Sequence, residues 1–492
     1  MTLEDEAIQY SSETFEELAR LIYNSGGFNS SQLGSTQGRN ALKETQRILS
    51  EAIKTGIEYN IPAELLYALE NNAFIFSGFK TFHTMREIGL SMVTDKGEIK
   101  SFEQFYNDVQ TINNSYNRHH LYSEYNHAVG ATQMAVKWQE FQDNAEEYYL
   151  QYRTANDERV REEHAELHGI TLPASDSFWD KHYPPNGWNC RCTVVEVLKS
   201  KYEQTNPEEA RKRGAECART EKDKVFWYNP GKTMKLFPPR HPYYKAPKED
   251  KKFIQQISQE EARNKRIEDM IAELPDNLTP EEKRAIAEHN LKLEEALQIS
   301  KGERMTVEQA DKQNANPNYG KERGYGINCQ TCTPAYMLRT MGFDITAKSN
   351  TPGSKLDYLS RGFHAWEIWQ NPDGTPAKHY TVNTWLRDKG YRQMTEKRWL
   401  QYFNEACKDP GIYGLSVGWK GGGGHMTVLQ RFEDGELRYI EPQHDNSKGS
   451  GRENRNLSYL AKAAAAHQHD CRGIMRIDNK LFNLDYLEIF NK

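Results

Sequence analysis

Apolar residues in the first part of the chain recur at three- and four-residue intervals, which is the period of an amphipathic helix. This pattern predicts helices over residues 14–59 and again over 102–141. We interpret the apolar stripe of the second block as core packing. The stripe consists of Ala128, Ala131, Met134, Ala135 and Trp138. The N-terminal half is therefore expected to be mainly α-helical.

The amino-acid composition of the sequence changes twice after these helices. Residues 151–194 contain a polar run, a short helix that holds His164, and a segment at 183–192 whose prolines and glycine predict an irregular turn. Residues 248–302 are dominated by Lys, Glu and Ala, and the Thr-Pro-Glu-Glu sequence at 279–282 is a helix start signal. We expect this second segment to be a helical linker.

Beyond residue 302 short β-like runs alternate with helical patterns. A helix is predicted over 333–341 and ends at Gly342. The other predicted elements are strands at 343–347, 413–419, 425–432 and 436–442, and helices at 396–407 and 457–467. The fold class is therefore multidomain, with a mainly α-helical N-terminal half and an α+β C-terminal domain that contains an antiparallel sheet. The expected divisions are a helical N-terminal region at 1–71, a second domain at 72–247, the helical linker at 248–302 and the C-terminal domain at 303–492.

Length, charge and cysteine usage narrow the classes of function. A chain of 492 residues can form two or three packed cores, and its net charge of −6 argues against nucleic acid as the main partner. No apolar stretch is long enough to span a bilayer, and the acidic residues 1–6 do not have the pattern of a secretory signal. The seven cysteines suit a reducing cytoplasm better than a disulfide framework.

The strongest chemical signal is the sequence Asn-Cys-Gln-Thr-Cys at 328–332, followed later by four glycines and His425. A helix N-terminus and a neighbouring histidine both stabilise a thiolate, which is the nucleophilic form of cysteine. Cys332 is near Pro334, which favours the first turn of a helix, and Cys329 follows an asparagine whose amide could donate to an oxyanion. Both thiols are candidates. The alternative is a CxxC metal or redox motif, although no second such pair lies nearby to complete a zinc site.

The residues after His425 predict a β-hairpin with a definite register. Residues 433–435 (Glu-Asp-Gly) have the pattern of a three-residue loop with a left-handed glycine. This loop places His425 opposite Gln443 and Glu441 opposite Thr427, so that His425, Glu441 and Gln443 share one face. An acid or amide beside an imidazole is the arrangement of a catalytic triad. A two-residue loop would turn Glu441 to the other face, and an ordinary exposed hairpin is the alternative interpretation.

Several of these motifs resemble the papain-fold toxin family of bacterial polymorphic toxins. The resemblance covers about residues 304–490, and the motifs that carry it lie at 328–332, 335–339, 342–347, 419–425 and 439–443. In that family an Asn-Cys dipeptide supplies the nucleophile, which corresponds to Cys329, and a Gly-His motif corresponds to His425. The acid of an Asp-Pro-Gln motif corresponds to Glu441, where this chain departs from the usual aspartate. Gln443 is the alternative group to orient the imidazole.

The resemblance implies a papain-like C-terminal domain and a cysteine-dependent hydrolase that deamidates glutamine on a target protein. The Cys329 thiolate would attack the side-chain carboxamide, and His425 would protonate the departing ammonia and then activate water. No cofactor is required for this chemistry. Peptide-bond cleavage or transglutamination would use the same groups, so a papain-like cysteine protease or a transglutaminase effector is the alternative.

The first half resembles the phage Mu F-type (MuF) head-morphogenesis family, on motifs at 74–80, 152–155, 158–161 and 184–192. The family consists of minor capsid components associated with the portal, so residues 72–247 are expected to be a MuF-like domain. Some relatives carry cysteines where this chain has Arg161 and His164, and these form a zinc site with the Cys-Arg-Cys pair. A structural zinc ion here would take its ligands from four residues. They are His164, His182, Cys190 and Cys192. The alternative is that both cysteines are small buried residues of a tight turn.

Together the two resemblances imply a phage or prophage minor head protein that carries a toxin domain. The expected partners are a target protein, phage portal or capsid proteins and a cognate immunity protein. The expected location is the virion or the cytoplasm of the producing cell, with the toxin domain acting in the cytoplasm of a target cell. The rival interpretation is a purely structural capsid or portal-associated protein with an inactive extension.

Overall fold

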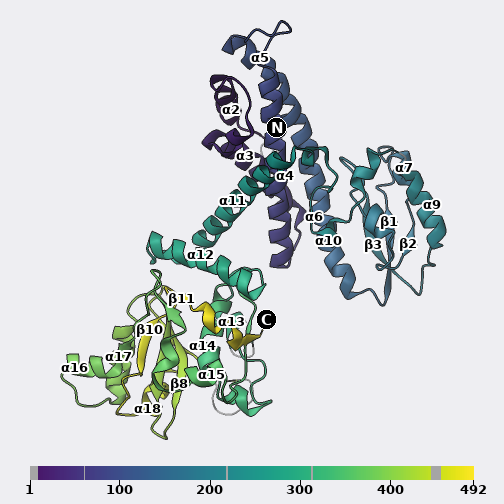
Figure 1. The fold of residues 1–492 in the computed structure, drawn as a ribbon. Coiled ribbons are helices and arrows are strands. Elements are labelled where there is room, and N and C mark those ends of the chain that lie inside the picture. Colours follow the sequence, from purple (N-terminus) through teal and green to yellow (C-terminus); the bar gives the residue numbers. More distant parts are fainter. Residues whose placement is uncertain (1–8, 60, 218–219, 312–313, 445–455, 492) are drawn as a thin grey trace. The chain divides into compact units, whose positions relative to one another are not determined.

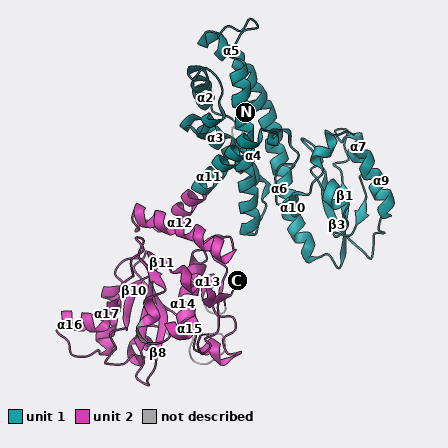
Figure 2. Ribbon diagram, viewed as in Figure 1, with its two compact units in different colours: residues 1–265 teal, residues 266–492 magenta. Residues whose placement is uncertain are grey.

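The structure is a computed structural model that describes residues 9–59, 61–217, 220–311, 314–444 and 456–491. The chain forms two compact units, residues 1–265 and residues 266–492 (Figure 2). The division falls inside helix α11 (Lys248–Ala272), within the segment predicted to be a linker. The finer four-part division of the sequence stays a prediction. Among the described residues, no helix has the length and apolarity needed to cross a bilayer.

The first unit is mainly α-helical, as the apolar period predicts (Figure 1). Its long helices are α2 (Ser12–Asn24), α3 (Thr36–Gly56), α4 (Ala63–Leu90), α5 (Phe102–Asn113) and α6 (Leu121–Asp143). Serine N-caps begin α2, α3 and α5 by accepting a hydrogen bond from a backbone N–H of the first turn. A π-helical segment, Asn114–His120, joins α5 to α6. All five residues of the predicted stripe on α6 are buried.

A small antiparallel sheet in the first unit was not predicted. Its central strand β1 (Tyr148–Arg153) pairs with β2 (Thr171–Leu172) and β3 (Thr193–Leu198). Leu150 and Tyr152 of β1 pack in one hydrophobic cluster with Met134 and Trp138 of α6. The sequence at the start of this region has a polar pattern because β1 contains only one aliphatic residue, Leu150, which is buried together with Gln151 and Tyr152.

Short elements complete the first unit. They are α7 (Glu162–Ala165), α8 (Trp179–His182), α9 (Pro207–Cys217), η3 (Asp223–Phe226), α10 (Pro230–Thr233) and η4 (Pro242–Tyr244). Residues 183–192 contain neither helix nor strand, which confirms the predicted irregular turn. This turn leads directly into β3, and it therefore lies beside the new sheet.

The second unit is built around a five-stranded antiparallel sheet with the order β6-β10-β7-β8-β9. The strands are β6 (Tyr380–Thr381), β7 (Gly411–Gly418), β8 (Gly424–Arg431), β9 (Leu437–Ile440) and β10 (Gly473–Arg476). Met426 and Val428 of β8 belong to the core that contains α14 (Cys329–Thr340). Leu429 belongs to the core of α16 (Val382–Asp388), α17 (Glu396–Ala406) and α18 (Leu457–Ala463). Alternate residues of β8 thus face different helical layers.

The remaining elements of the second unit frame this sheet. The predicted start of α12 (Pro280–Leu297) is confirmed, because Thr279 and Glu282 form a capping box and Pro280 is the first helical residue. The others are α13 (Val307–Ala310), η5 (Arg323–Gly326), α15 (Lys355–Leu359), η6 (Gly362–Trp366), η7 (Leu484–Ile489), and the two-stranded pairs β4 (Thr346–Ala347) with β12 (Phe490–Asn491) and β5 (Trp369–Gln370) with β11 (Leu481–Phe482).

The β8–β9 hairpin has the predicted register. Val428 pairs with Ile440, as the three-residue loop predicts, and β9 ends there, so that Glu441 is the first residue beyond the paired strand. Gly435 in the connecting loop has a φ of 85°, the left-handed conformation that a three-residue loop requires. The confirmed register explains why residues from two strands reach one side of the sheet.

Helix α14 begins four residues earlier than predicted, at Cys329 instead of residue 333. Pro334 therefore lies inside the helix and not in its first turn. The proline removes one backbone hydrogen bond, and the helix persists because its residues from Gln330 onward are buried. This correction matters for the chemistry, since it places Cys329 and not Cys332 at the helix N-terminus.

Candidate functional site

Two cysteines compete for the role of nucleophile in the second unit, and their surroundings differ. Cys329 is the first residue of α14, and the residue is half-buried. Cys332 is fully buried, and its Sγ donates to Oδ1 of Asn328 at 3.4 Å. Burial raises the pKa of the Cys332 thiol well above its usual value. Of the two sequence candidates, Cys329 is accessible and Cys332 belongs to the hydrophobic core.

His425 and Glu441 form the second part of the site. His425 lies on β8 and Glu441 follows the end of β9, and Nε2 of the imidazole is 2.7 Å from Oε2 of the carboxylate. Both side chains are buried. The hydroxyl of Tyr439 donates to the same Oε2 at 2.5 Å, and the backbone N–H of Gln443 donates to Oε1 at 3.2 Å. These contacts hold the carboxylate in one orientation behind the ring.

The charges of the three groups are coupled. Burial raises the pKa of the Cys329 thiol, but the hydrogen bond to His425 and the charge of that ring bring it below its usual value. Burial lowers the pKa of His425, but the charge of Glu441 and the contact with Cys329 raise it to about 10. The pKa of Glu441 falls to about 2, since the charge of His425 outweighs burial. The shifts describe a thiolate, an imidazolium and a carboxylate in a row.

Gln443 does not contact the imidazole, although one interpretation of the sequence gave it that role. Its carboxamide faces the N-terminus of α14, and in the amide orientation that satisfies both of its polar atoms the oxygen accepts from the backbone N–H groups of Asn328 and Cys329 at 3.0 Å each. The reason is geometric: β9 ends at Ile440, and the chain beyond it carries Gln443 past the ring to the helix. Of the two residues predicted to orient the imidazole, Glu441 is therefore the one that does so.

The side chain of Asn328 is also used differently from the prediction. Its Nδ2 donates to the carbonyl of Lys348 at 2.9 Å and to Oδ1 of Asn316 at 3.1 Å, so it is not directed at an oxyanion. Asn316 in turn donates to the carbonyl of Gln443 at 2.9 Å. These buried amides tie the start of α14 to the segment after β9, and they thereby fix the thiol relative to the imidazole.

Sequence reasoning missed four further residues, which contact the imidazole or the side chains next to it. The indole of Trp419 stacks on the ring of His425, with centroids 5.6 Å apart. Tyr439 contacts Glu441, and Tyr319 contacts His444, whose ring centroid is 5.9 Å from that of His425. Tyr439 shares the odd-numbered face of the hairpin, so the same alternation could have identified it. Tyr319 gives no local signal, because only the tertiary fold brings it to this place.

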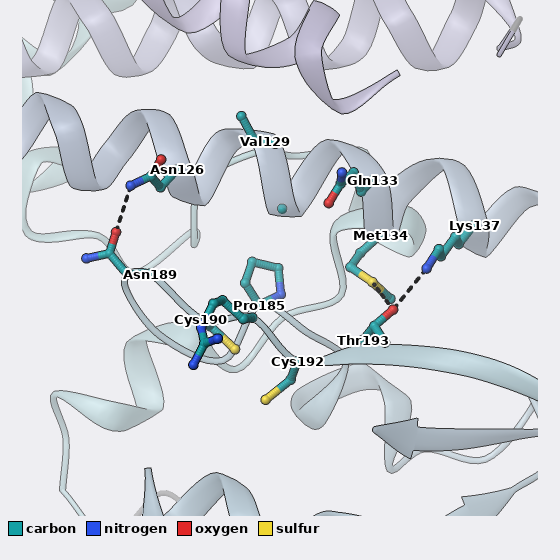
Figure 3. Close-up of a pocket in the computed structure, with 12 residues that line it drawn as sticks. Asn126, Val129, Gln133, Met134, Lys137, Pro185, Asn189, Cys190, Cys192 and Thr193 are labelled. Carbon is teal, nitrogen blue, oxygen red and sulfur yellow. Dashed lines mark hydrogen bonds between the residues drawn. The ribbon is translucent and has the colours of Figure 1, made fainter. Parts of the chain in front are cut away.

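The predicted metal ligands of the first unit are brought together in part. The two sulfurs of Cys190 and Cys192 each lie 3.7 Å from Nδ1 of His164, and the three ligand atoms lie within 4.8 Å of one another. Tetrahedral zinc holds neighbouring sulfur and nitrogen ligands about 3.6 Å apart. Figure 3 shows both sulfurs on the side of the turn that faces away from α6. The spacing therefore fits a zinc ion.

His182 is not part of this cluster, and its prediction as a ligand is corrected. Its ring packs against Phe178 and Trp227, at centroid distances of 4.8 and 6.0 Å. Nε2 points toward the backbone of α9, where a Cβ on Gly214 would come within 2.5 Å of it. Burial lowers the pKa of His182 to about 4. The residue is a neutral ring in the core, because α8 directs it toward α9.

A cavity of about 550 Å³ lies between α6 and the turn that carries the two cysteines (Figure 3). Polar side chains bridge its walls. Asn126 donates to Asn189 at 3.1 Å, and Nζ of Lys137 donates to the hydroxyl of Thr193 at 3.0 Å. Cys190 and Cys192 are themselves among the residues that line the cavity.

Part of the first unit is similar in sequence to a known protein family. Residues 95–195 match the family described as Phage Mu protein F like protein. Residues 95–195 are a Phage Mu F-like domain. The match contains His164, Cys190 and Cys192, whereas Cys329, His425 and Glu441 lie outside it.

Two curated relatives align with a stretch of 61 residues. One is protein F of Escherichia phage Mu, named for capsid assembly, which is 48% identical over 12% of this chain and 14% of that protein. The other is the Mu-like prophage FluMu F protein of Haemophilus influenzae, which is 43% identical over 12% of this chain and 15% of that protein. The chain thus spans about a seventh of the length of each relative. No solved structure matches the chain.

Proposed function

We propose that this chain is a phage head-associated protein whose second unit is a cysteine-dependent hydrolase that deamidates protein glutamine. The observation that carries the enzymatic part is the row of Cys329, His425 and Glu441, which α14, β8 and the end of β9 bring together. The resemblance of residues 304–490 to papain-fold toxins supports a papain-like unit and a glutamine carboxamide as the substrate.

The reaction follows from the three groups. Sγ of Cys329 bonds to the carbonyl carbon of a glutamine side chain, and the C–N bond breaks as His425 gives its proton to the leaving nitrogen. His425 then takes a proton from water, whose oxygen displaces Sγ from the thioester and leaves glutamate. Glu441 keeps the ring oriented and compensates its charge. The products are one ammonia and one glutamate side chain.

The oxyanion needs donors close to Cys329. The backbone N–H groups at the start of α14 have no carbonyl of their own helix to bond to, and they lie at the positive end of the helix dipole. The Gln443 carboxamide accepts from two of them. A substrate carboxamide, which is the same chemical group, would take its place on these donors.

The test uses the full chain and compares it with Cys329→Ala on a lysate of candidate target cells. A deamidase converts glutamine to glutamate at defined sites, which peptide mass spectrometry detects. Cys407→Ala, in a buried thiol of the same unit, is the matched control and keeps the activity. Cut peptides would identify a cysteine protease, and amine-linked glutamines a transglutaminase. Identical lysates from the native chain and Cys329→Ala would refute the enzymatic proposal.

The proposed role of the first unit is in the phage head. It is supported by the match of residues 95–195 to the Mu F family and by relatives whose names refer to capsid assembly and to a Mu-like prophage. Its partners would be portal or capsid proteins, and its location the virion or the producing cell. The second unit would act on a target protein in the cytoplasm of another cell, with an immunity protein protecting the producer.

The head-associated role is tested by purifying particles from cells that express the full chain and the other head proteins. The chain should co-sediment with heads, and it should do so equally well in Cys329→Ala. A chain that is absent from purified heads would contradict this role. A purely structural protein would predict co-sedimentation without any change in the lysate experiment, so the two experiments separate the two proposals.

A structural zinc ion in the first unit is the remaining part of the proposal. His164, Cys190 and Cys192 fit the ion by spacing and by donor chemistry, since thiolate and imidazole are its preferred ligands. Three protein ligands leave one position of a tetrahedral ion for a group outside this cluster. The ion would tie α7 to the turn before β3, and its chemistry would be structural cross-linking.

A further inference from the structure

His444 lies in the candidate active site, and the proposed reaction gives it no role. Ligand atoms of His425, Glu441 and His444 lie within 4.8 Å of one another. The ring centroids of the two histidines are 5.9 Å apart, and their planes are tilted by 39°. Nothing in thiol hydrolysis requires a second imidazole beside the orienting carboxylate. The cluster therefore needs a separate explanation.

The donors of this cluster are already held in place by neighbouring groups. Nδ1 of His444 is 2.6 Å from the hydroxyl of Tyr319. The Glu441 carboxylate accepts from the Tyr439 hydroxyl at one oxygen and from the Gln443 backbone N–H at the other. Outer-shell hydrogen bonds of this kind orient ligating imidazoles and carboxylates in metal sites. The arrangement is the one expected of a built site and not of a chance meeting of side chains.

Two imidazoles and one carboxylate are a recurrent donor set for zinc and related divalent ions. We propose that His425, Glu441 and His444 bind a divalent transition metal ion such as Zn²⁺, and that the bound ion switches off the thiol chemistry. The binding part stands on the cluster alone, whereas the inhibition rests on the proposed function. Cys329, which also neighbours the His425 imidazole, is not needed as a ligand of the metal ion.

Inhibition follows from the atoms that the ion would take. Nε2 of His425 and Oε2 of Glu441 now hydrogen-bond each other at 2.7 Å. A metal ion would separate them and occupy both donors, so the ring could neither accept nor return a proton, and the carboxylate could no longer orient it. The enzyme would be inactive with metal and active without it. His444 would be the residue that makes this state favourable.

The experiment compares the full native chain with His444→Gln, and it follows metal and chemistry separately. Both proteins are stripped with a chelator and titrated with Co²⁺, whose visible absorption reports the number and type of its ligands. The first unit contributes equally to both spectra and cancels in their difference. In parallel, the rate of glutamine deamidation is measured for each protein in chelator and in excess Zn²⁺, and the ratio of the two rates is the readout.

The expected result is a Co²⁺ difference spectrum typical of nitrogen and oxygen ligands, and a rate ratio of at least about tenfold for the native chain that falls toward one in His444→Gln. Equal Co²⁺ spectra in the two proteins, or equal Zn²⁺ inhibition, would overturn the proposal. A His444-dependent Co²⁺ signal without any deamidation would leave the metal site standing and refute the proposed function instead. Deamidation that Zn²⁺ does not affect would refute the inhibition.

Discussion

The two clusters of cysteine and histidine use the same residue types in opposite ways. In the first unit two sulfurs converge on one imidazole, each 3.7 Å from Nδ1 of His164. In the second unit one accessible sulfur meets an imidazole whose far side is 2.7 Å from the Glu441 carboxylate. Among the residues that the structure describes, no carboxylate joins the ligand atoms of the first cluster, and the second sulfur of the CxxC sequence in the other unit, that of Cys332, is buried in the core.

The difference shows what decides the chemistry of a thiol. Two thiolates beside one imidazole repel each other, and a metal ion that binds all three groups offsets this repulsion, which is the arrangement of a structural metal site. One sulfur beside a ring that a carboxylate polarises is stabilised as a nucleophile without any metal. The partner on the far side of the imidazole, and not the cysteine itself, distinguishes the two clusters.

The largest effect is expected when the accessible sulfur of the second cluster is removed. Cys329→Ala should lower the rate of glutamine deamidation at least about 10⁴-fold, because no other accessible thiol touches His425. Cys332→Ala is the matched control, since it removes a sulfur one helical turn away. It should keep the activity and lower the melting temperature instead, because it leaves a small void in the core. The reverse outcome would make Cys332 the nucleophile.

The next effect removes the partner that distinguishes the clusters. Glu441→Gln should lower the deamidation rate about 10²–10⁴-fold, because a neutral amide neither fixes the ring nor compensates its charge. Alkylation of Cys329 by iodoacetamide at fixed pH should slow as well, since the thiolate loses support. Glu441→Asp, the residue that the family resemblance expects, should lose less. A Glu441→Gln protein with unchanged alkylation and turnover would contradict the assigned role.

The third effect breaks the first cluster. The double change Cys190→Ser and Cys192→Ser should reduce bound zinc from about one ion per chain to almost none. It should also cost about 4 kcal/mol in the free energy of unfolding when zinc is a thousandfold above its Kd. Elemental analysis and thermal melts with and without chelator measure both. Cys217→Ala, another buried thiol of the same core, is the control and should keep the ion. Metal retained by the double variant would refute the site.

The smallest expected effect tests whether His182 belongs to the ligand set of the first cluster. His182→Phe should leave the zinc content unchanged and alter the free energy of unfolding by less than about 1.5 kcal/mol, because the ring is neutral and packed among aromatic neighbours. The same elemental analysis and melts apply. Loss of the ion in this variant would restore His182 to the ligand set.

In the second unit, the alternation of residues along the strands gave the most accurate structural prediction. Alternation and one three-residue loop were enough to put Glu441 beside His425, because strand register is a local property once the turn is known. Helix starts were predicted well where capping residues mark them, as at Thr279. The start of α14 was not, since Asn328 makes tertiary hydrogen bonds and its side chain does not cap the helix.

What the sequence did not show depends on contacts between distant segments. The sheet β2-β1-β3 was missed because β1 has a single aliphatic residue, Leu150, and the residues buried beside it are Gln151 and Tyr152. His182 has the right residue type and the right distance along the chain for a zinc ligand, but α8 turns it into the core. Tyr319 and His444 meet only in the folded unit. Residue type and spacing alone do not determine these outcomes.

The glycine run before His425 has a consequence for what can reach the thiol. Side chains at Gly421, Gly422 and Gly423 would project into open space, whereas one at Gly424 would collide with Arg472. Gly421, Gly422 and Gly423 therefore add only main chain to the loop between the indole of Trp419 and the imidazole of His425. A stretch of main chain without side chains lets the surface of a protein substrate, as proposed above, approach this loop closely.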